Sequence, residues 1–145
     1  MTAIKMSESI QYKNYILLKD RRYQDTHEWI KIIEENKVRV GITDYAQKKL
    51  KSIVYVDTPE VGKDIEKGEL ITTVESVKAV GEVISPVNGK ILSFNEKLED
   101  DPSLINNDPY GEGWIVEIEV TNPSELDNLL DVEGYIEVIK KEEEE

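Results

Sequence analysis

The chain has 145 residues, and its 31 acidic residues exceed its 18 Lys and Arg residues, which gives a formal net charge of −13. This length favours a single domain, and the negative charge disfavours nucleic-acid binding, which uses clustered Lys and Arg against phosphates. The absence of cysteine excludes disulfides, thiolate metal sites and cysteine nucleophiles. The only histidine is His27, so a multi-histidine metal site is excluded, and no metal is expected.

The apolar runs of the sequence are short. Ile53–Val56 is typical of them, whereas a membrane-spanning helix needs about 20 apolar residues. The N-terminal segment also lacks the apolar core of a secretory signal peptide. We therefore expect a cytoplasmic protein with no membrane association, and its high net charge favours a monomer.

Short β-strands are predicted along most of the chain. A strand is expected at 15–18, and alternating apolar and polar residues predict a hairpin formed by 28–34 and 38–42. Thr43 has the side chain of a helix N-cap and Asp44 suits the first turn, so a two-turn helix is predicted next. Further strands are predicted at 53–56, 69–76, 81–85 and 113–120.

Two turn-rich segments lie between these strands. Asn88-Gly89 is a strong signal for a type I′ turn, so a hairpin is expected to join 86–87 to 90–94. The segment 95–113 is rich in Asn, Asp, Pro and Gly and is expected to be a long loop.

The C-terminal part is predicted to be helical. Pro123 suits the first turn of a helix, and a second helix is predicted from about 133 to 141. The glutamates at 142–145 are expected to form a frayed acidic tail. The fold class is therefore mainly β, a flattened β-sandwich with a short internal helix and C-terminal helices.

Lys78 lies at a tight turn between two predicted strands. An isolated lysine is most often an ordinary exposed residue. Its neighbours Val77, Ala79 and Val80 are apolar, however, which would suit an enzyme that grips the turn and acylates the amine. Acylation removes the charge and makes the lysine a tether for a cofactor. Both interpretations stay open on the residues alone.

Residues 75–79, with the sequence ESVKA, resemble the lipoylation site of glycine cleavage system H proteins. The similarity is collinear from about residue 22 to the C-terminal helix. Its other motifs are Tyr23 followed by HEW at 27–29, VGITDYAQ at 40–47, PEVG at 59–62, SPVNG at 85–89 and DPYGEGW at 108–114. We therefore divide the chain into an N-terminal extension (1–21), a carrier domain (22–141) and an acidic tail (142–145).

The resemblance implies the barrel-sandwich hybrid fold of lipoyl and biotinyl domains. It implies a non-catalytic carrier of glycine catabolism and one-carbon metabolism, with lipoic acid attached to Lys78 as N6-lipoyllysine. The carrier would take an aminomethyl group from the glycine decarboxylase (P-protein) to the aminomethyltransferase (T-protein). Dihydrolipoyl dehydrogenase (L-protein) would reoxidise the cofactor, and a lipoylating enzyme would attach it.

The resemblance also implies roles for residues near the cofactor. Glu75 is expected to help the lipoylating enzyme recognise the turn. Thr26, Glu28 and Glu82 match positions of a cleft that shelters the cationic cargo, where carboxylates would pair with its ammonium. His27 is interpreted as a structural hydrogen-bonding residue. The residues expected to hold or flank the cofactor are Lys78, Glu75, Val77, Ala79, Thr26, Glu28 and Glu82.

Other functions stay open beside this one. An H-like carrier can serve another lipoate-dependent pathway, such as sulfur oxidation with a heterodisulfide-reductase-like complex, or a relay of lipoyl groups. A biotinyl domain is disfavoured because Val77-Lys78-Ala79 replaces the usual Met-Lys-Met. A 2-oxoacid dehydrogenase domain is disfavoured because it usually has Asp-Lys-Ala. In a non-carrier scaffold, Lys78 would be idle.

Overall fold

The structure is a computed structural model that describes residues 8–144. Its strands are β1 (Ser9–Tyr12), β2 (Tyr15–Leu18), β3 (Arg22–Tyr23), β4 (Glu28–Glu34), β5 (Lys37–Ile42), β6 (Ile53–Val56), β7 (Asp64–Ile65), β8 (Leu70–Ser76), β9 (Val80–Ile84), β10 (Gly89–Phe94) and β11 (Val116–Val120). Its helices are α1 (Asp44–Leu50), α2 (Lys97–Asp100), α3 (Leu104–Asn107), the 3₁₀ helix η2 (Pro123–Asn128) and α4 (Val132–Glu144).

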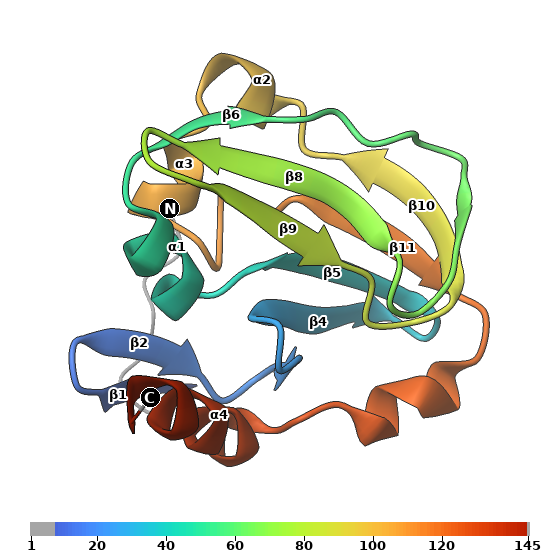
Figure 1. Ribbon diagram of the computed structural model, residues 1–145. Helices are drawn as coiled ribbons and strands as arrows, with labels where there is room; N and C mark the ends of the chain where they lie inside the picture. Colours follow the sequence, from blue (N-terminus) through green and yellow to red (C-terminus); the bar gives the residue numbers. More distant parts are fainter. Residues whose placement is uncertain (1–7, 145) are drawn as a thin grey trace.

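Two antiparallel sheets pack face to face (Figure 1). The larger sheet has the strand order β3-β4-β5-β11-β10-β7 and the smaller has β6-β8-β9. One apolar core joins their inner faces, with Val40 and Ile118 from the larger sheet and Val74 and Val83 from the smaller all fully buried. The prediction of a mainly β sandwich with an internal helix and C-terminal helices is confirmed.

The predicted hairpin at Asn88-Gly89 is wrong. β9 pairs with β8, whereas β10 pairs with β11 and β7, so the chain passes from the smaller sheet to the larger one between 85 and 88. Neither Asn88 nor Gly89 has the positive φ of a type I′ turn. Glycine is needed at 89 because a Cβ there would lie 2.1 Å from the carbonyl oxygen of Glu119 on β11.

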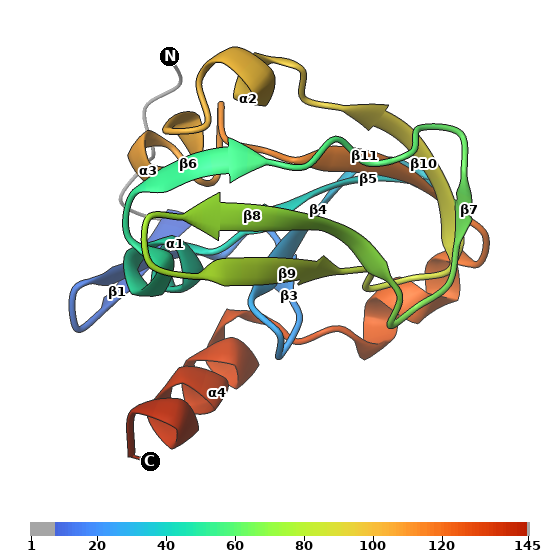
Figure 2. The same ribbon diagram turned by 45° about the horizontal axis from the view of Figure 1, so that its top comes forward.

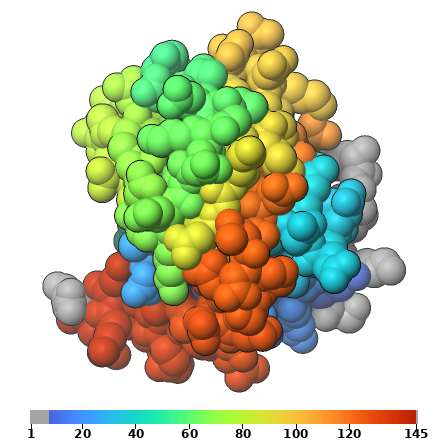
Figure 3. All heavy atoms as spheres, turned by 90° about the vertical axis from the view of Figure 1, so that its right-hand side faces the viewer, coloured from blue at the N-terminus to red at the C-terminus, as the bar shows by residue number. Residues whose placement is uncertain are grey.

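The predicted loop at 95–113 contains the short helices α2 and α3. Leu98 in α2 and Ile105 in α3 are buried in the main core. Burial of these two side chains orders a segment whose polar composition by itself favours a loop. Figure 3 shows the end of the molecule where the chain crosses between the sheets, with the segment that contains η2 in orange against it.

The C-terminal segment differs from its prediction in two ways. The helix begun by Pro123 is the 3₁₀ helix η2. The helix α4 continues to Glu144, so the prediction of a frayed tail is wrong for 142–144, and Glu145 lies outside the described residues. Tyr135 and Ile139 anchor α4 because they are fully buried.

The hairpin β1–β2 packs beside α1 and α4, as the views in Figures 1 and 2 show together. The strand predicted at 15–18 is confirmed as β2. Leu17 belongs to a second buried cluster that it shares with Tyr23 and Tyr135. The Tyr23 hydroxyl accepts from the Leu18 amide at 2.8 Å and donates to the Leu18 carbonyl at 2.7 Å. The second cluster therefore joins the hairpin to the body of the protein; residues 1–7 of the predicted extension lie outside the described residues.

The helix predicted after Thr43 is confirmed as α1. Thr43 is its N-cap, and the hydroxyl accepts a hydrogen bond from the Ala46 amide at 3.2 Å. Each helix within residues 8–144 is too short or too polar to span a bilayer.

Candidate functional site

Lys78 lies at the tip of the turn between β8 and β9. Ser76 closes this turn, because its amide donates to the Ala79 carbonyl at 2.8 Å and its hydroxyl accepts from the Ala79 amide at 3.0 Å. The Lys78 amide also donates to the Ser76 hydroxyl, at 3.3 Å. Within residues 8–144 the Lys78 ammonium has no hydrogen-bond or ion-pair partner, and the residue is exposed. The backbone and the Ser76 hydroxyl thus hold the turn while the Lys78 amine stays free.

Apolar side chains surround the turn on its outer face. Val77 is 73% exposed and Val80 is 59% exposed. Tyr55 pairs with Glu75, and Glu75 pairs with Val80, so these three residues form one row across the smaller sheet. Exposed apolar residues that cluster around one polar group are typical of an interaction surface.

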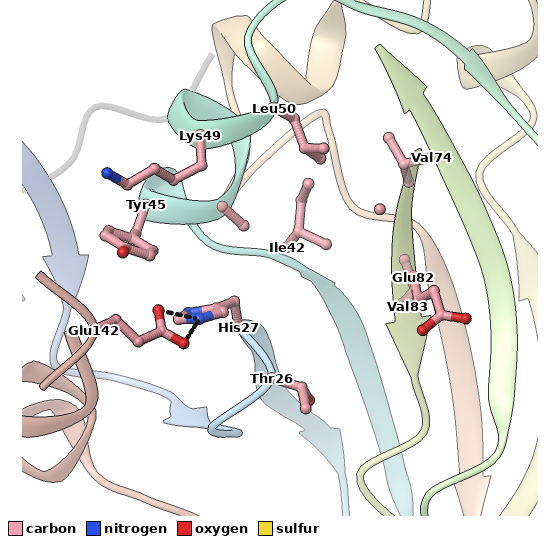
Figure 4. Close-up of a pocket in the computed structure, with 12 residues that line it drawn as sticks. Thr26, His27, Ile42, Tyr45, Lys49, Leu50, Val74, Glu82, Val83 and Glu142 are labelled. Carbon is pink, nitrogen blue, oxygen red and sulfur yellow. Dashed lines mark hydrogen bonds and ion pairs between the residues drawn. The ribbon is translucent and has the colours of Figure 1, made fainter. Parts of the chain in front are cut away.

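A groove with a volume of about 300 Å³ lies between the edge strand β9, the helix α1 and the end of α4 (Figure 4). We call it the β9–α1 groove. Its lining residues are Thr26, His27, Ile42, Tyr45, Ala46, Lys49, Leu50, Val74, Gly81, Glu82, Val83 and Glu142. An apolar surface with a few polar groups is the usual lining of a ligand pocket.

The packing of α1 against β9 shapes this groove. Gly81 faces Leu50, and a Cβ at Gly81 would lie 3.0 Å from the Leu50 Cδ1 atom. Because the glycine has no side chain, α1 approaches the strand closely while space remains beside Ile42 and Val83.

Two of the residues predicted to shelter a cation line this groove. Thr26 reaches it from the turn before β4, and Glu82 from β9 (Figure 4). Among the described residues, the Glu82 carboxylate has no hydrogen-bond or ion-pair partner. It is therefore available to a cation that enters the groove.

Glu28, the third of these residues, is fully buried and does not line the groove. Its Oε2 accepts from the Ile84 amide of β9 at 2.9 Å, and its Oε1 accepts from Gln24 at 2.8 Å and from the Thr26 hydroxyl. Burial raises the pKa of the Glu28 carboxyl above its usual range, while the hydrogen bonds from Ile84, Thr26 and Gln24 oppose that shift. Glu28 of β4 therefore links the larger sheet to β9 of the smaller sheet, and it also holds the Thr26 hydroxyl above it.

His27 contributes to the groove as well as to the packing. Its Nδ1 lies 2.7 Å from the Tyr135 hydroxyl and its Nε2 lies 2.8 Å from Glu142. The hydrogen bonding expected of this residue is present. Three further groove residues, Tyr45, Lys49 and Glu142, were not predicted from the sequence. The helical spacing of Tyr45 and Lys49 in α1 is the only sequence pattern that points to two of them.

The strand β9 joins the turn to the groove. Glu82 follows Lys78 by four residues, which places its Cα at most about 14 Å from that of Lys78. Thr26 and Glu82, far apart along the chain, thus meet in the groove near Lys78, whereas Glu75, Val77 and Ala79 stay on the exposed turn.

The two packed antiparallel sheets place the protein in the class of lipoyl domain-like folds. A family model described as "Glycine cleavage H-protein" matches residues 21–142. The probable glycine cleavage system H protein of Aeropyrum pernix is 49% identical over 130 residues, which is 90% of each chain. A glycine cleavage system H protein of Thermus thermophilus is 52% identical over 124 residues, 86% of this chain and 96% of the relative.

A solved structure is similar as well. The crystal structure of a glycine cleavage system H protein from Mycobacterium marinum matches with a TM-score of 0.78 and 37% identity, over 86% of this chain and 99% of that one. The chain therefore belongs to the glycine cleavage H-protein family, whose members are lipoyl-bearing carriers.

Proposed function

We propose that this protein is the lipoyl-bearing shuttle of a glycine cleavage system. It carries an aminomethyl group from the glycine decarboxylase to the aminomethyltransferase on a lipoyl group attached to Lys78. The observation that carries the proposal is a free, exposed lysine at a hairpin tip beside a groove with apolar walls and carboxylates. The hard chemistry belongs to the cofactor and to the partner enzymes, so the chain itself is not an enzyme.

The turn suits attachment of the lipoyl group. The Lys78 ammonium has no partner within residues 8–144 that a modifying enzyme must displace. Val77 and Ala79 are exposed on either side of Lys78, and Glu75 adds a negative charge near the end of β8. A lipoylating enzyme with a basic, partly apolar surface would fit this arrangement.

The residues of the β9–α1 groove fit a hydrocarbon arm with a cation at its end. Ile42, Leu50, Val74 and Val83 supply apolar contacts for the arm. The bound lipoyl group supplies the sulfur that carries the one-carbon unit between enzymes. Glu82 would then accept hydrogen bonds from the ammonium of the cargo, and the walls of the groove would exclude water from it.

Thr26 and Glu28 act together in this proposal. The Thr26 hydroxyl donates to Glu28 and faces the groove, so its oxygen can accept a hydrogen bond from the cargo ammonium. The negative charge of Glu28 beneath it favours a cation at that position. Direct contact between Glu28 and the ammonium would require the Thr26 side chain to rotate away.

The partners follow from this cycle. They are the decarboxylase, the aminomethyltransferase, dihydrolipoyl dehydrogenase and a lipoylating enzyme. All four would act on the Lys78 arm, and we propose that they meet a monomeric carrier in the cytoplasm. The net charge of −13 favours docking to basic partner surfaces.

Mass spectrometry and one assay test the function. The protein is incubated with a lipoylating enzyme and activated lipoate, and a single lipoyl mass increment is expected, which Lys78→Arg abolishes. The lipoylated protein is then added to glycine decarboxylase, where it should support exchange of the glycine carboxyl group with bicarbonate.

Two results would contradict the proposal. An increment that persists in Lys78→Arg would move the attachment to another lysine. A lipoylated protein that gives no exchange with the decarboxylase would favour a carrier of another lipoate-dependent pathway.

A further inference from the structure

The last turn of α4 supplies a carboxylate to the β9–α1 groove. Glu142 lines the groove on the side away from Glu82 (Figure 4). Both oxygens of Glu142 lie close to the His27 Nε2 atom, at 2.8 and 2.9 Å. The Glu142 side chain nevertheless stays 43% exposed, against 17% for His27. A carboxylate has about four acceptor positions, so Glu142 keeps acceptor capacity for a ligand.

The position of this carboxylate is well defined. Tyr135 and Ile139 bury the inner face of α4, which fixes the helix against the body of the protein. The His27 ring is fixed from its other side, because Nδ1 contacts the Tyr135 hydroxyl, which in turn lies 2.7 Å from the Thr43 hydroxyl. The Nε2 atom is thereby directed at Glu142.

The charges around this end of the groove favour a cation. Lys49 lines the groove, but its ammonium lies 3.4 Å from Glu143. Hydrogen bonds from Tyr15 and Lys49 hold the pKa of the Glu143 carboxyl below its usual range, so Glu143 is ionised and offsets Lys49. Glu82 and Glu142 then remain as the two carboxylates that line the groove.

We propose that Glu142 supplies the second negative charge that holds the ammonium of the cargo in the groove, together with Glu82. The inference rests on the proposed function, because the cargo is the primary ammonium at the end of the loaded arm. Glu142 adds a carboxylate from a helix to the one that Glu82 supplies from a strand. Two negative charges along one groove attract a cation more strongly than Glu82 alone.

Substitution by glutamine separates this role from packing. In Glu142→Gln the side chain keeps its size, and its carbonyl oxygen can still accept a hydrogen bond from His27. Only the charge is lost. Glu144→Gln is the matched control, because it removes one charge from the same helical turn and does not line the groove. Glu142→Asp keeps the charge on a shorter side chain.

The first measurement is the loss of cargo from the loaded protein. Water breaks the sulfur–carbon bond and leaves a thiol, formaldehyde and ammonium, so release of formaldehyde and ammonium reports it. We expect release from Glu142→Gln to be roughly 3-fold faster than from the unsubstituted protein. Glu142→Asp should lie between the two, and Glu144→Gln should match the unsubstituted protein.

The second measurement uses the protein without its lipoyl group. Methylammonium chloride is titrated at constant ionic strength, with sodium chloride as the reference, and amide signals are followed by NMR. Saturable shifts at Glu82 and Glu142 are expected. They should weaken in Glu142→Gln and persist in Glu144→Gln.

The outcomes separate this inference from the proposed function. Equal release from Glu142→Gln and the unsubstituted protein, or equal acceleration in Glu142→Gln and Glu144→Gln, would overturn the role of Glu142 and leave the carrier function intact. Failure of the unsubstituted protein to accept any lipoyl group or cargo would overturn the carrier function. The methylammonium titration then still decides whether Glu142 binds a primary ammonium.

Discussion

The Lys78 turn and the β9–α1 groove are joined by one strand, yet they hold their polar groups in opposite ways. At the turn, the backbone and Ser76 make the contacts, and the lysine side chain is left free. Beneath the groove, the buried Glu28 carboxylate accepts hydrogen bonds from three donors. In the groove lining, His27 is held through both ring nitrogens. The difference agrees with the proposed roles: several enzymes would have to reach an attachment point, whereas a groove that shelters a cargo would have to be shaped before the cargo arrives.

The two regions should therefore respond differently to loss of a single charge. Substitutions at the turn should change recognition by enzymes and leave stability unchanged. Substitutions beneath the groove should change stability and leave recognition of the turn unchanged.

The largest effect is expected from Glu28→Gln. In the variant, an NH2 group replaces one of the two carboxylate oxygens, and NH2 cannot accept a hydrogen bond. At least one of the donors from Ile84, Gln24 and Thr26 therefore loses its acceptor. Loss of a buried acceptor costs about 2 kcal/mol, and the free energy of unfolding measured with urea should fall by that amount. The rate of lipoylation of Lys78 should not change; a stable Glu28→Gln variant would contradict the role of Glu28 as a link between the two sheets.

The pH dependence of the free energy of unfolding, measured for the unsubstituted protein and for Glu28→Gln, provides a control for this prediction. Because burial raises the pKa of Glu28, the folded state binds a proton more tightly than the unfolded state. Its contribution therefore favours folding at low pH and weakens as pH rises from about 4.3, the usual value for glutamate, through the raised pKa. The stability difference between the unsubstituted protein and Glu28→Gln should be larger in acid than at neutral pH, and the opposite trend would contradict the raised pKa.

Glu75→Gln should act at the turn alone. Glu75 is exposed between Tyr55 and Val80, and in the proposed function it contacts the enzyme that acylates Lys78. We expect kcat/KM for lipoylation to fall roughly 10-fold, with the free energy of unfolding unchanged. Glu133→Gln removes an exposed charge from α4, away from the turn, and should leave lipoylation unaffected. An equal loss in both variants would indicate a general effect of net charge.

Glu82→Gln should affect the groove without affecting stability or lipoylation. The Glu82 carboxylate has no partner among the described residues, so its removal leaves no donor unpaired. Release of cargo from the loaded protein should become about 5-fold faster, as expected for one charge-assisted hydrogen bond. Glu75→Gln is the control, because it removes a charge at the turn and not in the groove. It should release cargo at the same rate as the unsubstituted protein. If Glu82→Gln held its cargo normally, Glu82 would not belong to the shelter.

The smallest effect is expected from salt. Because the protein carries a net charge of −13, its docking to the decarboxylase should weaken by roughly 3-fold as ionic strength rises from about 0.05 M to about 0.3 M. Binding is measured with the lipoylated protein at each salt concentration. Cargo release from the isolated carrier should depend less on salt, because the cargo is held by contacts within one molecule and not by docking of two charged surfaces. A stronger salt dependence for cargo release than for docking would contradict the distinction between the two regions.

The sequence by itself determined the parts that depend on local chemistry. The ESVKA turn, the alternating residues of β4 and β5 and the capping side chain of Thr43 each predict a structure that forms from neighbours along the chain. The motifs were also sufficient to indicate the family, because they occur in a collinear order over most of the chain.

Only the tertiary structure decided which distant segments meet. Asn88-Gly89 has the composition of a hairpin turn, but the carbonyl of Glu119 and the pairing of β10 with β11 place it at the crossing between two sheets. Glu28 is a polar residue in a strand of alternating apolar and polar residues, a pattern that predicts exposure to solvent. It is buried because β9 packs over it. Glu142 belongs to an acidic run that favours fraying, yet packing of α4 carries it to the groove, because burial of Tyr135 and Ile139 outweighs the repulsion among the terminal glutamates.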